Sequence, residues 1–134
     1  MKIIQVTGLP CSGKTTAISS YMLKNKNFKY LDIRSHLGPS KFNTYKKEIL
    51  KSSGNIVAES ASGIAIPGSY VIRLEVAKRV LYKRTLEREG ELDEYFISLI
   101  EKDMIEPQYT AKNEKALHAI LDALLGADTN GILL

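Results

Sequence analysis

The chain is poor in cysteine and histidine, and it lacks a long apolar run. It has one cysteine, Cys11, and two histidines among 134 residues. A single cysteine excludes an internal disulfide framework and fits a reducing compartment, so the cytoplasm is the expected location. So few sulfur and imidazole ligands also exclude a zinc site of the usual type. The first residues lack the apolar region of a signal peptide, and no run of about 18 apolar residues occurs, so no membrane span is expected.

The length and the net charge of the chain limit the number of domains and the kinds of partner that are expected. A chain of 134 residues is long enough for one domain with its own core, and nothing in it suggests a second, so residues 1–134 are predicted to form a single domain. Lys and Arg outnumber Asp and Glu by 19 to 15, which gives a net charge of +4. This mild excess favours a polyanionic partner, although a basic surface without a partner explains it equally well.

What the sequence does contain is a phosphate-binding loop. Residues 8–15 read Gly-Leu-Pro-Cys-Ser-Gly-Lys-Thr and match the pattern G-x-x-x-x-G-K-[ST]. An apolar, strand-like run of Ile3, Ile4 and Val6 precedes the loop, and a helix-like stretch follows it. This strand–loop–helix context is the one that the motif requires, and it argues against a mere glycine-rich turn with an exposed lysine.

The residue types of the loop explain its chemistry. Gly8 and Gly13 permit backbone angles that turn successive N–H groups toward phosphate oxygens, at the positive end of the following helix. Lys14 is expected to reach the β- and γ-phosphates of ATP, the Thr15 hydroxyl to ligate Mg²⁺, and Thr16 to approach the α-phosphate. The residues expected to bind the nucleotide are Gly8, Cys11, Ser12, Gly13, Lys14, Thr15 and Thr16.

Strand-like and helix-like segments alternate along the rest of the chain. Further strands are expected at 28–33, 56–58 and 70–74, with a weak one near 109–112. Helices are expected at about 41–52, 77–89, 92–105 and 114–125, the last of them ended by Gly126. This alternation predicts an α/β, three-layer P-loop NTPase fold with a mostly parallel sheet of four or five strands and helices on both faces. Ligands of such sheets bind at the carboxyl ends of the strands.

Two carboxylates and an arginine are expected at that edge of the sheet. Asp32 ends the second strand, where a carboxylate can accept the proton of an attacking hydroxyl, or can form a turn or pair with Arg34. Glu59 follows an apolar strand directly, where a carboxylate holds Mg²⁺ directly or through water, or acts as the general base instead. Arg34 is expected either to grip an anionic acceptor or to form a surface ion pair.

A basic segment lies further along the chain. Residues 73–88 contain six basic and two acidic side chains, and Arg84 and Arg88 lie near the end of one predicted helix. Phosphoryl transfer needs cations over the migrating group, and a lid that carries these two arginines would supply them. The alternative is a solvated basic face that pairs with the acidic stretch after it.

With these motifs, the chain resembles the small P-loop kinases that phosphorylate nucleosides, nucleotides and polynucleotide ends. The match rests on residues 8–16, the strand that ends in Glu59, the basic segment 78–88 and the final helix. The start of the chain is similar to polynucleotide kinases, whose second strand ends in a catalytic aspartate, and Asp32 is the nearest matching position. Only one helix fits between the second and third strands, so a full monophosphate-binding subdomain and a large lid are missing.

The resemblance implies an enzyme that uses ATP and Mg²⁺. A compact basic kinase suits a polymer acceptor, and the chain is similar to the bacteriophage kinases that phosphorylate 5-hydroxymethyluracil within DNA. The expected reaction is therefore transfer of the γ-phosphate to a hydroxyl of a nucleotide-type acceptor within DNA. Two alternatives stay open: a kinase for a free nucleoside, nucleotide or other small metabolite, and a regulatory NTPase without an acceptor. The base-reading N-K-x-D signal of GTPases is absent.

Overall fold

The computed structural model describes residues 2–33, 47, 49, 51, 54–60, 66–102 and 104–133, with side chains as far as residue 126. The strands are β1 (Ile3–Thr7), β2 (Phe28–Asp32), β3 (Asn55–Glu59), β4 (Tyr70–Leu74) and β5 (Tyr109–Ala111). The helices with described bounds are α1 (Lys14–Lys24), α3 (Lys78–Glu89), α4 (Glu94–Lys102) and α5 (Glu114–Leu133). None of the helices in these ranges combines the length and the apolar character needed to cross a bilayer.

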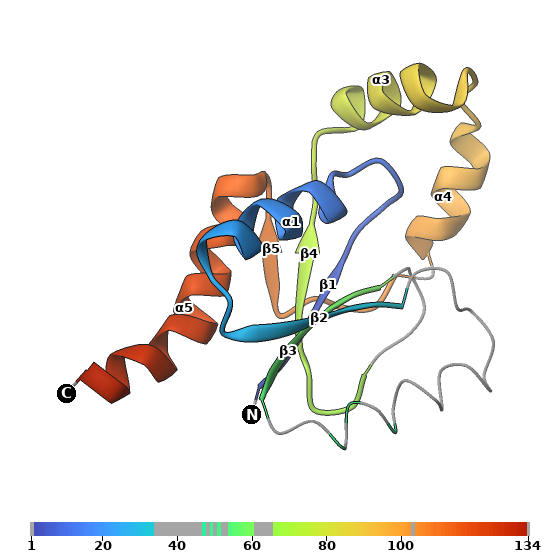
Figure 1. Ribbon diagram of the computed structural model, residues 1–134. Coiled ribbons are helices and arrows are strands. Elements are labelled where there is room, and N and C mark those ends of the chain that lie inside the picture. The colour runs from blue at the N-terminus through green and yellow to red at the C-terminus, as the bar shows by residue number, and fades with distance from the viewer. Residues whose placement is uncertain are drawn as a thin grey trace.

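All five strands form one parallel sheet in the order β2-β3-β1-β4-β5. The chain leaves β1 toward β2 and β3 on one side, and crosses back to β4 and β5 on the other side (Figure 1). All carboxyl ends therefore meet at one edge, and the loop after β1 lies where the connections diverge. This topology confirms the predicted three-layer α/β fold with a parallel sheet of five strands.

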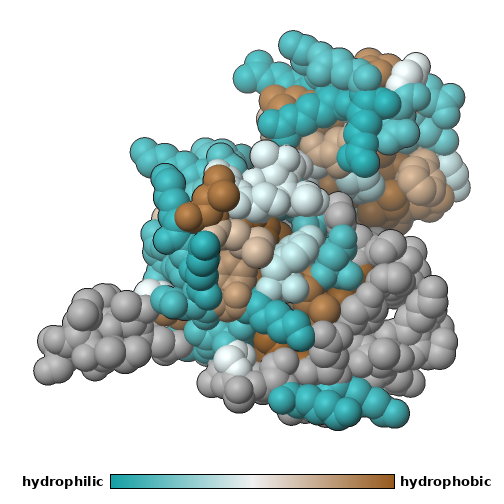
Figure 2. Space-filling view, in the orientation of Figure 1, coloured by the Kyte–Doolittle hydropathy of each residue, from teal (hydrophilic) through white to brown (hydrophobic). Residues whose placement is uncertain are grey.

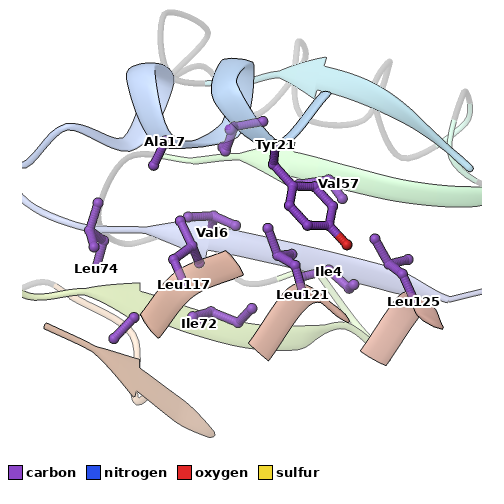
Figure 3. Close-up of a cluster of buried hydrophobic side chains, with 12 residues drawn as sticks. Ile4, Val6, Ala17, Tyr21, Val57, Ile72, Leu74, Leu117, Leu121 and Leu125 are labelled. Carbon is purple, nitrogen blue, oxygen red and sulfur yellow. The ribbon is translucent and has the colours of Figure 1, made fainter. Parts of the chain in front are cut away.

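One face of the sheet is covered by α1 and α5. Their apolar side chains pack with those of β1, β3, β4 and β5 into a single cluster of fully or almost fully buried residues (Figure 3). Leu117, Leu121 and Leu125 form one apolar stripe along α5, and each is at most 1% exposed. The Tyr21 hydroxyl of α1 donates to Asp122 of α5 at 2.8 Å, and burial together with this carboxylate raises the pKa of Tyr21.

The opposite face has a mixed composition. Side chains alternate along a strand, so Ile4 and Val6 point to the α1/α5 cluster while Gln5 and Thr7 point away from it. Under β2 and β3 this face is apolar, with Leu31, Ile33, Ile56, Ala58 and other residues in a second buried cluster. Under β1 and β4 it is polar: Gln5 and Thr7 are fully buried, and Arg73 lies next to Thr7 in the strand register.

The two helices α3 and α4 stand beyond the carboxyl edge of the sheet (Figure 1). Gly90 ends α3 with φ 78°, a conformation that favours glycine, and the Asp93 side chain accepts a hydrogen bond from the Phe96 N–H at the start of α4. The outer surface of this α3–α4 end is hydrophilic, and hydrophobic side chains gather beneath it (Figure 2).

Two predicted helix boundaries are wrong. The predicted helix 92–105 is α4, and it is shorter (Glu94–Lys102), because Asp93 caps it. The last helix does not end at Gly126 but continues to Leu133, and Gly126 does not adopt the positive φ of a helix-ending glycine. The predicted helix 41–52 lies outside the described residues except for 47, 49 and 51, which are helical.

Candidate active site

The loop after β1 has the shape that its sequence predicts. A Cβ at Gly8 would lie 2.7 Å from the Leu74 carbonyl oxygen of β4, so no larger residue fits there. Gly13 has φ 94° and Cys11 has φ 66°, both in the left-handed region, and these angles curl the loop into the start of α1. Gly13 occupies the N-cap position of α1, and the first turn of this helix contains no acidic residue. No carboxylate of α1 itself therefore neutralises the positive end of the helix dipole.

Lys14 lies inside the curl of this loop. Its ammonium group donates to the carbonyl oxygens of Gly8 and of Leu9, the latter at 3.3 Å, and the side chain is only 7% exposed. The charge is therefore held where the loop is most concave. Thr15 and Thr16 are exposed at the start of α1, as a role in binding phosphate or metal requires.

Glu59 is the best-defined acidic group of the site. It is fully buried at the carboxyl end of β3, and its carboxylate accepts hydrogen bonds from the Thr15 hydroxyl at 2.8 Å and from the Tyr30 hydroxyl at 2.9 Å. Carboxylate and hydroxyl oxygens are the hard ligands that Mg²⁺ prefers in P-loop enzymes, and here Thr15 and Glu59 are already together. The pair thus fits a magnesium ion beside the loop.

Tyr30 is a site residue that the sequence did not reveal. Its position in β2 looks like an ordinary aromatic strand residue, and part of its ring does pack against the α1/α5 cluster. In the register of β2 against β3, Tyr30 lies two residues before the residue that pairs with Glu59. Only this register brings the Tyr30 hydroxyl within reach of the Glu59 carboxylate. No local sequence signal distinguishes such a tyrosine from one that serves packing alone.

Asp32 lies beside Glu59, because the two are register partners in β2 and β3. Its side chain is half-buried, and it is not among the described residues that line the large cleft described below. Arg34, the predicted acceptor-binding arginine, lies outside the described residues. The structure therefore brings the two predicted carboxylates together and leaves the role of Arg34 as a prediction.

The two predicted lid arginines face the loop. The Arg84 guanidinium donates to the backbone oxygens of Ser12 at 3.2 Å and Cys11 at 3.4 Å. An Arg88 nitrogen lies 3.9 Å from the Cys11 sulfur. Both side chains are exposed, and they extend from α3 to the loop. Cations at this place suit the charge that develops during phosphoryl transfer.

A single cleft of about 1230 Å³ unites most of these groups. Its walls are the phosphate loop with the start of α1, Glu59, the β4–α3 connection, Arg84 and Arg88, two apolar residues of α4, and the start of α5. The α4 residues in the wall are Phe96 and Ile100, and the segment Lys112–Glu114 leads into α5. This cleft is large enough for a nucleoside triphosphate, and Lys14, Arg84 and Arg88 bring positive charge to its wall beside the phosphate loop.

Comparisons with known proteins identify solved structures with a similar fold. No protein-family model matches the chain, and no curated protein matches it. Among solved structures, shikimate kinase from Bacteroides thetaiotaomicron matches with a TM-score of 0.64 and 17% identity, over 93% of this chain and 98% of that one. A gluconokinase from Sinorhizobium meliloti matches with a TM-score of 0.66 and 14% identity, over 97% of each chain.

A third similar structure is the tunicamycin resistance protein of Deinococcus radiodurans, with a TM-score of 0.66 and 11% identity over 93% of this chain and 95% of that one. The similarity to these proteins extends over nearly the whole length of each chain, so this chain has the complete fold that they share. Identities this low establish the fold alone. The fold is that of the small P-loop kinases.

Proposed function

We propose that the protein is an ATP- and Mg²⁺-dependent kinase that phosphorylates a hydroxyl group of a free small molecule. The observation that carries this proposal is the convergence of Lys14, the Thr15–Glu59 pair and Arg84 on one cleft. Each of these groups serves the transfer of a phosphoryl group, and a loop that only bound a nucleotide would not need a lid arginine. The named kinases among the similar structures support the same chemistry.

In this proposal the loop and Lys14 hold the triphosphate, and Lys14 exchanges the Gly8 and Leu9 carbonyl oxygens for phosphate oxygens. Thr15 and Glu59 hold Mg²⁺, which neutralises charge on the phosphates when it is bound. Tyr30 keeps the Glu59 carboxylate in place. Arg84 and Arg88 leave the backbone and sulfur atoms of the loop and stabilise the migrating group.

Asp32 is the general base in this proposal. Glu59 is fully buried and holds two hydroxyl groups, which suits a metal-side role, whereas the half-buried Asp32 lies next to it at the same edge. The acceptor oxygen attacks the γ-phosphorus, the bond from that phosphorus to the bridging oxygen breaks, and ADP leaves with the bond electrons. The hydroxyl proton passes to Asp32.

A free acceptor takes the place of the DNA acceptor that the sequence suggested. Two of the similar structures, a shikimate kinase and a gluconokinase, are by name kinases of small molecules, which supports a free acceptor. DNA stays as the competing acceptor in the experiment.

The experiment is transfer of label from γ-labelled ATP to a panel of acceptors. The panel holds polyols, hydroxy acids, free nucleosides and mononucleotides, DNA with 5′-hydroxyl ends, and DNA that contains hydroxymethylated pyrimidines. We expect label on a free small molecule, in a reaction that stops when Mg²⁺ is removed. Label on DNA alone would replace the free acceptor with a polymer, and nucleotide hydrolysis without transfer to any member would identify a regulatory NTPase.

A further inference from the structure

The helix α3 has a side that neither the core nor the cleft uses. Only one of its 12 residues, Leu81, is buried. The residues of α3 that line the cleft are Val80, Arg84, Glu87 and Arg88. At 3.6 residues per turn, a second line of side chains follows the side of the helix that faces away from the cleft. Its members are Arg79, Tyr82, Lys83, Leu86 and Glu89, and we call them the outer stripe.

The outer stripe is accessible and includes an apolar side chain. Arg79, Lys83 and Glu89 are exposed, Tyr82 is half-buried, and Leu86 is 49% exposed. The helix lies at one end of the molecule, beyond the carboxyl edge of the sheet (Figure 1). Of the seven exposed large hydrophobic side chains among the described residues, four belong to α3 and α4, namely Leu86, Tyr95, Phe96 and Leu99. Such a concentration at one end of a protein is typical of a surface that contacts another molecule.

The charges of the outer stripe are ordered along the helix. Arg79 and Lys83 lie in its first half, and Glu89 is its last residue, with Tyr82 and Leu86 between the two ends. A second copy of α3 in the antiparallel direction is therefore complementary to the first. The pairs Arg79 with Glu89 and Tyr82 with Leu86 are both centred on position 84, so one two-fold axis at that level brings both into register. A parallel pair would instead bring like charges together.

We propose that two copies of this chain associate through their outer stripes, with the two α3 helices antiparallel about a two-fold axis. Arg79 of each copy pairs with Glu89 of the other, and Tyr82 packs against Leu86 of the other copy at the centre. Within one chain Glu89 lies 3.5 Å from Arg88, but both side chains are exposed, so that ion pair is weak and can be exchanged. The cleft lies on another side of α3, so both clefts stay accessible in the dimer.

The proposal is independent of the proposed function, and its first test is the mass of the unaltered protein in solution. One pair of short helices forms a small interface, so the association is expected to be weak and reversible. Sedimentation velocity over about a thousandfold range of protein concentration should show a shift from monomer to dimer. A protein that stays monomeric over the whole range would overturn the proposal.

Charge reversal identifies the surface and the direction of packing. Arg79→Glu and Glu89→Arg, each alone, should raise the dimer Kd about 10-fold or more, because each creates two contacts between like charges. In an equimolar mixture the two altered side chains face each other, and so do the two unaltered ones. Both contacts are then attractive, so the mixture should form a heterodimer with a Kd close to that of the unaltered protein. Lys24→Glu, at the exposed far end of α1, is the matched control and should leave the Kd unchanged.

The apolar centre of the stripe gives a test without a change of charge. Leu86→Gln should also raise the dimer Kd, whereas Leu23→Gln, at an 82% exposed position of α1, should not. A dimer that persists in all the α3 variants would place the contact elsewhere on the molecule and overturn the proposal. Loss of the dimer in both charge variants without recovery in their mixture would overturn the antiparallel pairing. If circular dichroism shows that Glu89→Arg disturbs α3, Arg79→Glu and Leu86→Gln with their controls still decide.

Discussion

The two faces of the sheet differ in what they bury. Toward α1 and α5, the strands bury a large apolar cluster that continues from β3 to β5, with the Glu59 carboxylate at its carboxyl edge. Away from these helices, β1 and β4 bury Gln5, Thr7 and part of Arg73. Parallel sheets covered on both faces are usually apolar on both. The polar stretch on one face of β1 and β4 departs from this rule.

The largest expected effect is at the phosphate loop, at the carboxyl edge of the sheet. Lys14→Ala should reduce ATP turnover by about 10³-fold, because it removes a positioned charge from the phosphates. The matched control is Lys24→Ala at the exposed far end of α1, which should leave turnover unchanged. Steady-state ATPase and transfer assays measure both. Equal activity of the two variants would remove the loop from the mechanism.

The next effect separates the two neighbouring carboxylates. Asp32→Asn should lower kcat about 10²-fold at saturating Mg²⁺, because it removes the base. Glu59→Gln should mainly raise the Mg²⁺ concentration needed for half-maximal rate, because Glu59 accompanies Thr15. Titration of the rate with Mg²⁺ distinguishes the two patterns. If Glu59→Gln lowered kcat at saturating Mg²⁺ and Asp32→Asn only raised the Mg²⁺ requirement, Glu59 would be the base.

In the apolar cluster under α1 and α5, a substitution should lower the free energy of unfolding and leave the catalytic activity unchanged. Leu121→Ala removes a fully buried side chain and should lower the free energy of unfolding by about 2–5 kcal/mol. Leu23→Ala is the control, since Leu23 is 82% exposed on α1 and should change stability little. Denaturant titrations measure the free energies, and activity per folded molecule should be unchanged in both variants. A loss of activity without a loss of stability would contradict the division between the faces.

On the polar face, Gln5 should matter for stability through its hydrogen bonds. Its amide donates to the Ser60 hydroxyl at 2.8 Å and accepts from the Ile66 N–H at 3.0 Å and from the Ser69 hydroxyl at 3.3 Å. Gln5→Leu leaves these groups buried without that partner, so we expect a loss of about 1–3 kcal/mol in the free energy of unfolding. A more stable Gln5→Leu variant in the same denaturant titration would show that this face tolerates an apolar core.

The smallest predicted effect concerns Tyr30. Tyr30→Phe keeps the ring but removes one of the two hydroxyl groups that hold the Glu59 carboxylate. We expect the Mg²⁺ concentration for half-maximal rate to rise about 10-fold with kcat little changed. Tyr95→Phe, at a 73% exposed position of α4, is the control. An unchanged Mg²⁺ requirement would reduce Tyr30 to a packing residue.

Most of the fold is predictable from local patterns in the sequence. The strands at 28–33, 56–58 and 70–74 and the weak strand near 109–112 agree with β2 to β5 within about two residues, because apolar runs and turns bound each of them. The end of α3 at Gly90 was equally clear. The end of α5 was not, since a glycine inside a helix costs only about 1 kcal/mol and neighbouring contacts can outweigh it.

The site was predictable only where a motif is contiguous. The phosphate loop, Glu59 and the lid arginines each follow from a local signal, and the structure places them together in one cleft. The partnership of Tyr30 with Glu59 and the polar stretch of Gln5, Thr7 and Arg73 depend on the strand register and on the order β2-β3-β1-β4-β5, which no short segment specifies. The one sequence clue was the alternation in β1, where Gln5 and Thr7 interrupt an otherwise apolar strand.

The close approach of Gly8 to Leu74 has a mechanical consequence. Leu74 is the last residue of β4, and the chain enters α3 after three further residues, of which Glu75 is fixed by its N–H to the Ala111 carbonyl oxygen at 2.7 Å. In the proposed function Arg84 and Arg88 move with α3 onto the phosphates, and Val76 and Ala77, which lie between the anchored Glu75 and the helix, are then the proposed pivot. A larger residue at Gly8 would press on the Leu74 carbonyl oxygen and so disturb the loop and the end of β4 together.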